Sequence, residues 1–252
     1  ARAVDNQNSN EDERSFARIS TAISKYWVTK RAPYLVFEAL ECHGGPGYIE
    51  ESVMPRLYRE APLNSIWEGS GNVMCLDVLR ALQRDKNALP ALLKELDLAK
   101  GANRNFDVSL DDLKSKLESS KGIETEARLI TEKMACLIQA SIFIRSGQEE
   151  KISAFCDSRL GSTWSGAFGT LSEGTNFEEI IHNMGGIPLW GKPGKDANYG
   201  LNKPGWIIHE VGTTRMGNNP KTSVTNEFER LHDVNNVYVV DAGPFVSQAD
   251  KN

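Results

Sequence analysis

The pattern of apolar residues changes abruptly near Ile181, and this change sets the limits on the fold. Upstream, apolar residues recur at helical spacing, and no stretch alternates as a half-buried strand would. Downstream, glycine- and proline-bearing turns follow one another, as at 185–188 and 191–194. We therefore expect a helical domain over residues 1–181 and a loop-rich segment over 182–252.

Size and charge narrow the classes of function. Of the 252 residues, 40% are hydrophobic, which permits a proper core. The net charge of −5, without a long basic block, argues against a nucleic-acid or anionic-membrane binder. No apolar run of about 18 residues predicts a membrane span, and the polar start does not resemble a signal peptide. The missing initial methionine and the patterned end indicate that both ends are cut.

The four cysteines are widely spaced along the chain. They form no Cys-x-x-Cys pair and have no pair of histidines nearby, so neither a metal site nor a disulfide framework is predicted. Reduced thiols are typical of an intracellular protein, and we expect a cytoplasmic one.

One carboxylate stands out in the helical part. Glu68 lies between Trp67 and Gly69, and the apolar run that follows predicts a largely buried helix from about Asn72. A bulky apolar neighbour can desolvate a carboxylate and make it a stronger base, while a glycine lets a ligand approach. Such a group on a turn before a rigid helix suits a general base. The alternative is a solvated loop glutamate before a core helix.

A glycine-rich turn, His43-Gly-Gly-Pro-Gly-Tyr48, precedes Glu68 in the chain. Glycines at this spacing can adopt positive φ or let the backbone approach a phosphate or a ring closely. A plain turn between two helices is the alternative.

Other elements follow from spacing and from turn residues. Apolar positions in 15–42 predict one long helix kinked near Pro33 or two short helices, either of which needs partners for its apolar face. The run 236–243 predicts a buried strand that ends on an acidic residue and a glycine. Further helices are expected over 87–100, 109–122 and 124–145.

The helical part resembles the C-terminal helical domain of acyl-CoA dehydrogenases, specifically the AidB-like branch. The motifs that carry the resemblance are Glu41-Cys-His-Gly-Gly-Pro-Gly-Tyr48, Pro55-Arg-Leu-Tyr-Arg-Glu60 and Asn64-Ser-Ile-Trp-Glu-Gly-Ser-Gly-Asn72, and the likeness extends to about residue 181. It implies a mainly α helical bundle that binds FAD and acts on an acyl-CoA. It also implies a homo-oligomer, usually a tetramer, formed through this domain.

The resemblance assigns roles to several residues. Glu68 would abstract the α-proton of a fatty acyl-CoA thioester while the β-hydrogen leaves as hydride to flavin N5. Ser70 matches the hydroxyl residue beside the flavin. Pro46 departs from the usual turn, and the family's N-terminal helical and β domains are missing. The positions that match the family's FAD-contacting turn, often supplied by a neighbouring subunit, are Gly44, Gly45 and Gly47.

The end of the chain is similar to the C-terminus of glucose-methanol-choline (GMC) oxidoreductases over about residues 183–252. That resemblance implies a short mixed α/β, loop-rich segment that contributes to FAD binding and to oxidation of an alcohol. His209 would take the hydroxyl proton, and its catalytic partner falls on Asn252. Asp241 and Gly243 would contact FAD, although the family's Gly-x-Gly-x-x-Gly fingerprint is absent. The motifs lie at 209–217, 219–224, 232–236 and 240–252.

Together these observations predict an FAD-linked oxidoreductase whose chain lacks most of each cofactor site and is inactive alone. An alternative is a non-catalytic helical association module or a fragment from a partial gene model. AidB-like members are also linked to DNA, but the charges between Pro90 and Gly161 are nearly balanced, so DNA binding is the weakest hypothesis.

Overall fold

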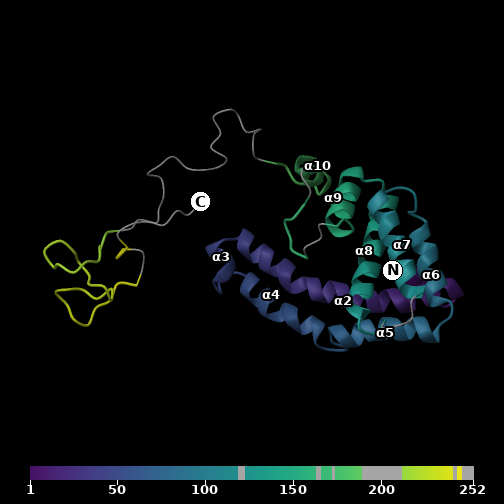
Figure 1. Ribbon diagram of the computed structural model, residues 1–252, viewed down its shortest axis with the longest axis horizontal. Coiled ribbons are helices and arrows are strands. Elements are labelled where there is room, and N and C mark those ends of the chain that lie inside the picture. The colour runs from purple at the N-terminus through teal and green to yellow at the C-terminus, as the bar shows by residue number, and fades with distance from the viewer. Residues whose placement is uncertain (119–122, 163–165, 172–173, 189–211, 241–242, 246–252) are drawn as a thin grey trace. The chain divides into compact units, whose positions relative to one another are not determined.

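The computed structural model describes residues 1–118, 123–162, 166–171, 174–188, 212–240 and 243–245. The chain divides into two compact units, Ala1–Pro188 and Leu189–Asn252. The first unit is a set of packed helices (Figure 1), which confirms the mainly α fold. The described residues of the second unit form turns and isolated bridges.

The long helix α2 (Glu11–Cys42) is the element around which the first unit is arranged. Its start is fixed by Asn10, whose side chain accepts a hydrogen bond from the backbone N–H of Glu13 at 3.1 Å. Acidic residues fill its first turn, where the helix dipole favours them. The helix continues through Pro33 without a break. The stretch therefore forms one long helix rather than two short ones.

Most of the remaining helices pack against α2. Those in contact with it are α1 (Arg2–Asn6), α3 (Gly45–Tyr48), α4 (Met54–Glu60), the 3₁₀ helix η1 (Ala61–Ser65), α5 (Gly71–Arg84), α6 (Ala88–Asp97) and α8 (Ala127–Ser146). The others are α7 (Arg104–Glu118), α9 (Glu149–Arg159) and α10 (Phe177–Asn183), of which α7 and α9 pack on α8 and α10 packs on α9. None of these helices combines the length and hydropathy of a membrane span.

The core lies where α2, α5, α6, α7 and α8 meet. Met134 is fully buried there, as its helical spacing predicted, so its role is packing. The large side chains in this core that are at most 1% exposed are Ile19, Ile23, Val78, Leu92, Leu96, Phe106, Leu110, Leu113, Ile130, Met134 and Leu137.

Helix α5 is less buried than its composition predicted. It begins at Gly71, close to the expected start, and it packs against α2 and α8. These neighbours cover one face only, because Val73 is 52% exposed and Leu76 is 42% exposed. The expectation of a largely buried helix was therefore wrong for the outer face.

Helix α7 begins five residues before the position expected from the sequence, at Arg104 rather than Ser109. The cap is Asn103, whose side-chain oxygen accepts hydrogen bonds from the backbone N–H groups of Asn105 and Phe106. Ser109 lies inside the helix, and its hydroxyl lies 3.3 Å from the carbonyl oxygen of Leu160. The earlier start brings Phe106 into the core.

The buried strand expected over 236–243 is not found in its described part. Tyr238 makes an isolated antiparallel bridge with Arg230. Tyr238 is 56% exposed and Val240 is 87% exposed. A buried strand needs neighbours on both sides to take its backbone hydrogen bonds, and the described residues of this unit offer no such sheet.

Candidate functional site

Glu68 lies on the loop that joins η1 to α5, at a sharp change of chain direction. Its φ is +51°, in the left-handed region that non-glycine residues rarely adopt. Gly69 follows with φ +114°, a conformation open in practice only to glycine. Two consecutive residues of positive φ therefore hold Glu68 at the entrance to α5.

Solvent reaches this loop from the outside. Glu68 is exposed, and Trp67 is itself 56% exposed. The shielding expected from Trp67 is therefore absent, because no described part of the chain covers the two side chains. The backbone conformation of residues 68 and 69, and not packing by Trp67, therefore positions Glu68.

A groove of about 750 Å³ has Glu68 on its wall. Its other walls come from the N-terminal half of α2, from α5 and from α1, with Thr21, Met74 and Val4 among the lining residues. Arg18 also lines it, and its guanidinium lies 2.9 Å from the carboxylate of Asp77 on α5. The groove is thus lined by charged side chains as well as by apolar ones such as Met74.

Lys25 of α2 contacts the Glu68 loop directly. Its ammonium donates hydrogen bonds to the backbone carbonyl oxygens of Asn64 at 3.0 Å, Trp67 at 2.9 Å and Gly69 at 2.7 Å. These carbonyls lie on both sides of Glu68 in the chain. Sequence patterns gave no sign of this contact, since Lys25 precedes the loop by about 40 residues.

Ser70 is the N-cap residue of α5 and has an extended backbone conformation. Its hydroxyl makes no capping hydrogen bond to the helix, and the residue is exposed. The hydroxyl beside Glu68 therefore remains available to a ligand.

The glycine-rich turn follows the C-terminal end of α2, whereas Lys25 and the Glu68 loop lie near the middle of that helix. Gly44 has φ +61°, and neither Gly44 nor Gly45 has a heavy atom within 4 Å of where a Cβ would stand. Gly47 is different, since a Cβ there would overlap the carbonyl oxygen of Leu40. Gly47 is thus a glycine for a packing reason, while Gly44 and Gly45 leave room for a ligand's close approach.

Within one chain the structure does not bring the glycine turn and Glu68 together. The Glu68 loop contacts α2 at Lys25. The glycine turn begins after Cys42, the last residue of that helix. At 1.5 Å per residue, the two positions are separated by roughly 25 Å along the helix axis.

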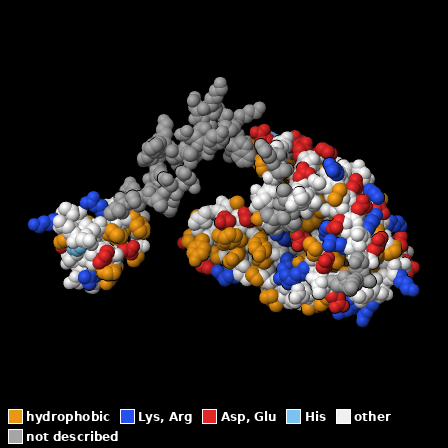
Figure 2. Space-filling model, viewed as in Figure 1, with side chains coloured by type: hydrophobic (Ala, Val, Ile, Leu, Met, Phe, Trp, Pro, Cys, Tyr) orange, Lys and Arg blue, Asp and Glu red, His pale blue; other side chains and the backbone are white. Residues whose placement is uncertain are grey.

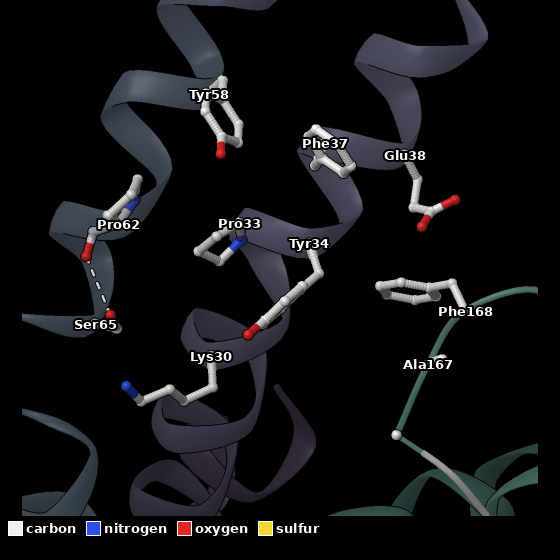
Figure 3. A pocket seen from close by; sticks show the side chains of 11 residues that line it. Lys30, Pro33, Tyr34, Phe37, Glu38, Tyr58, Pro62, Ser65, Ala167 and Phe168 are labelled. Atoms are coloured by element: carbon white, nitrogen blue, oxygen red, sulfur yellow. Dashed lines mark hydrogen bonds between the residues drawn. The ribbon is translucent and has the colours of Figure 1, made fainter.

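A second groove, lined by aromatic side chains, lies between α2, α4 and residues 166–168 of the first unit. The sequence did not reveal it. Figure 3 shows Phe37 of α2 next to Tyr58 of α4, with Tyr34 one turn earlier on α2 and Phe168 on a separate segment. Its volume is about 750 Å³, and the Phe37 and Tyr58 ring centroids are 5.9 Å apart. The guanidinium of Arg31 stacks over the Phe168 ring, with its carbon 4.2 Å from the ring centroid.

In the second unit, three of the four predicted residues, His209, Asp241 and Asn252, lie outside the described residues. Gly243 is described and buried, and its carbonyl oxygen accepts a hydrogen bond from the backbone N–H of Thr214 at 3.1 Å. The described parts of the first and last GMC-like motifs therefore lie side by side within this unit.

A serine and a histidine also meet in the second unit, with Ser223 Oγ 3.0 Å from His232 Nε2. The same Nε2 lies 3.0 Å from the carbonyl oxygen of Gly217, which can only accept, so Nε2 carries the proton. A nitrogen that already holds a proton cannot take another from the serine. This pair fastens the loop and is not an activated nucleophile.

Both ends of the chain match known families. Residues 1–83 match the family described as acyl-CoA dehydrogenase, C-terminal domain, and residues 192–252 match the family described as GMC oxidoreductase. Both predicted resemblances are confirmed. The two families are FAD-dependent oxidoreductases.

Relatives show how far each likeness extends. AidB of Escherichia coli (strain K12) is 37% identical over 187 residues, which are 74% of this chain and 34% of AidB. Acyl-CoA dehydrogenase family member 11 of Caenorhabditis elegans is 37% identical over 112 residues, 44% of this chain and 18% of the relative. The 2-methyl-1,2-propanediol dehydrogenase of Mycolicibacterium austroafricanum is 58% identical over 38 residues, 15% of this chain and 6% of the relative. The chain spans 34% or less of the length of these relatives.

The acyl-CoA dehydrogenase-like unit has features that fit contacts with FAD. The open backbone at Gly44 and Gly45 would admit a ring or a phosphate, and the Ser70 hydroxyl is unused by its helix. Because the turn follows the C-terminal end of α2 and Ser70 caps the start of α5, these are two separate partial contact sites.

Proposed function

We propose that the helical unit carries the base of a flavin-dependent acyl-CoA dehydrogenation, and that Glu68 is this base. The family match over residues 1–83, which include the Trp67-Glu68-Gly69 motif, supports this role. The groove beside Glu68 also has apolar side chains, such as Met74, against which an acyl chain could lie. An exposed carboxylate held on a rigid turn can take the α-proton of a thioester that lies in this groove. Bound FAD would supply the hydride acceptor for the β-hydrogen.

The second part of the proposal is that one copy of this chain does not close a flavin site and is inactive alone. The exposed Glu68 and Trp67 support this, as does the separation of the glycine turn from Glu68 along α2. In a homo-oligomer, the turn of one copy would complete the site of another. The role of His209, with Asn252 and Asp241, in oxidising an alcohol is proposed from the motif match alone.

An exposed aromatic face near α3 and α4 supports self-association. It is formed by Tyr34, Phe37, Tyr48 and Tyr58. Hydrophobic side chains gather there over the surface (Figure 2), and they include Tyr34 at 63% and Tyr48 at 78% exposure. Sedimentation of Tyr34→Ser beside Leu98→Ser, an exposed apolar position away from this face, tests the idea. A shift to smaller species is expected only for Tyr34→Ser.

Flavin binding and reduction test the proposed base. The purified protein is mixed with excess FAD, alone and with the separately prepared N-terminal helical and β domains of an AidB relative. Acyl-CoA is then added without oxygen. Loss of the oxidised-flavin band is expected only in the mixture. Glu68→Gln should slow it at least 100-fold, while the exposed Glu178→Gln should not change it. Equal rates for the two variants would overturn Glu68 as the base.

A further inference from the structure

We propose that Lys25 is the positioning residue for Glu68, acting through the backbone of the loop and not on substrate. The inference rests on the proposed role of Glu68. It follows from three hydrogen bonds that converge on one ammonium group.

The ammonium of Lys25 has three N–H donors and no acceptor, and each donor has a carbonyl partner within 3.0 Å. Asn64 is the partner in the last turn of η1, where carbonyls have no helical N–H to accept from. Trp67 and Gly69 are the residues immediately before and after Glu68. The lysine therefore fixes the peptide groups on both sides of the proposed base.

The loop needs such a tether because its backbone is strained. A glutamate at φ +51° persists only where its surroundings hold it there. The exposed Trp67 cannot do so by packing. Charge-assisted hydrogen bonds from a cation to carbonyls are stronger than neutral ones, so Lys25 is suited to the task.

Lys25 is itself well anchored. It projects from α2 beside two buried residues, Ile23 and Tyr26, which fix that part of the helix in the core. The ammonium of Lys25, on a rigid helix, thus positions the loop that carries Glu68. Precise sites require such support from a rigid element.

The other cations that line the groove, Arg14 and Arg18, are paired elsewhere in the described part of the chain, Arg14 with Glu11. Arg18 pairs with Asp77 on α5, and no hydrogen bond to the loop is found for it among the described residues. Arg18 therefore provides a matched control, since its loss removes one positive charge from the same groove without removing a contact to the loop.

Amide hydrogen exchange of the full chain tests the tether without flavin. In Lys25→Met, the amides of Ile66 and Trp67 should exchange at least 10-fold faster, whereas Arg18→Met should leave them unchanged. Both amides donate to the carbonyl oxygen of Leu63 and so report the order of the loop. Unchanged exchange in Lys25→Met, or equal acceleration in Arg18→Met, would overturn the proposal.

Rescue of the ammonium separates positioning from general packing. In a Cys42→Ser background, Lys25→Cys is treated with bromoethylamine, which restores an ammonium on a side chain of lysine length. The fluorine resonance of 5-fluorotryptophan at Trp67 should move in the untreated variant and return after treatment. Ethylation in place of aminoethylation should not restore it, and equal recovery with both reagents would refute a role for the charge.

Two further outcomes are separable. If Lys25→Met does not fold, Lys25→Gln retains an amide donor and should give an intermediate exchange rate; a wild-type rate would refute the tether. If Glu68→Gln reduces flavin normally, the base assignment fails, while the exchange results still decide whether Lys25 holds the loop.

Discussion

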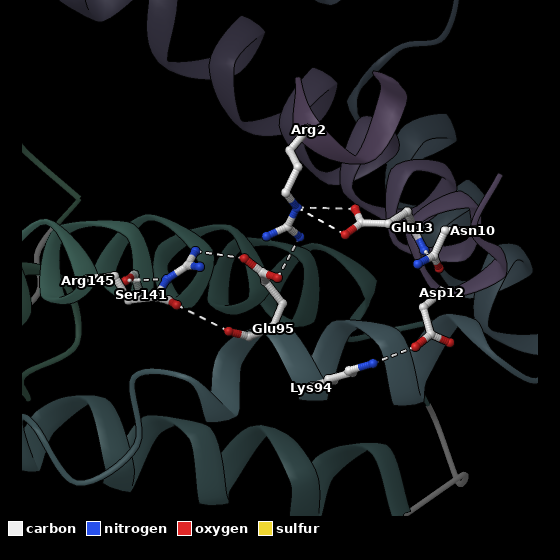
Figure 4. Close-up of polar contacts among 8 residues, drawn as sticks. All are labelled: Arg2, Asn10, Asp12, Glu13, Lys94, Glu95, Ser141 and Arg145. Atoms are coloured by element: carbon white, nitrogen blue, oxygen red, sulfur yellow. Dashed lines mark hydrogen bonds and ion pairs between the residues drawn. The ribbon is translucent and has the colours of Figure 1, made fainter. Parts of the chain in front are cut away.

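The guanidinium of Arg2 lies 2.8 Å from the carboxylate of Glu95 and so ties the first helix of the chain to α6. Glu95 is 13% exposed and also pairs with Arg145 of α8 at 2.7 Å, as Figure 4 shows. Burial raises the pKa of Glu95, but the hydrogen bond from Arg2 and the charges of both arginines outweigh it, so the pKa lies below its usual value of 4.5.

This network predicts a pH-dependent loss of stability for Glu95→Gln. At pH 7 the change should cost about 1–3 kcal/mol, because two arginines lose a charged partner. Since the folded pKa is depressed, the contribution is present above the unfolded pKa near 4.5 and disappears as pH falls through the folded value. Urea unfolding should therefore show a gap between variant and wild type that narrows below pH 4.5. Glu11→Gln, at a 66% exposed position, is the control and should show little effect.

Core packing predicts a contrast between two leucines of α8. Leu137 is fully buried, whereas Leu129 is 48% exposed. Leu137→Ala should lower the free energy of unfolding by about 2–5 kcal/mol through lost burial and a residual cavity. Leu129→Ala should change it by about 0.5 kcal/mol or less. Equal losses in denaturant titration would contradict the placement of α8.

The glycine turn predicts a contrast between Gly47 and Gly45. Gly47→Ala places a methyl group against the Leu40 carbonyl and 2.9 Å from His43 Cβ, so it should destabilise the end of α2 by about 1–3 kcal/mol. Gly45→Ala meets no atom within 4 Å and should be close to neutral. Thermal unfolding followed by circular dichroism measures both, and a neutral Gly47→Ala would show that the turn can shift.

Thiol reactivity should distinguish one cysteine from the other three. Cys42 is exposed, while Cys75, Cys136 and Cys156 are buried. Desolvation raises the pKa of Cys136 to about 12 and that of Cys156 to about 11, and it also raises the pKa of Cys75. At pH 8 a thiol reagent should therefore label one group rapidly and all four only after unfolding. Cys42→Ser should abolish the rapid phase, and a remaining rapid phase would place another thiol at the surface.

Local sequence determined most of the helical unit. The apolar spacing predicted α2 and α5 to within a few residues at the N-terminal ends, and it identified α6 and α8. It missed the start of α7, because the capping role of Asn103 depends on its side-chain conformation. It also predicted a strand near Tyr238 that would need a sheet beside it.

For the candidate site, the sequence alone determined which residues carry chemistry: Glu68 with its flanking Trp and Gly, the glycine-rich turn, and the two family motifs. Only the tertiary structure decided which of them meet. The packing of α2 brings Lys25, near the middle of this helix, to the carbonyl of Gly69, 44 residues away, and leaves the glycine turn beyond the helix's C-terminal end. The physical reason is that periodicity and turn preference act between neighbours in the chain, whereas contacts between distant residues depend on how the helices pack.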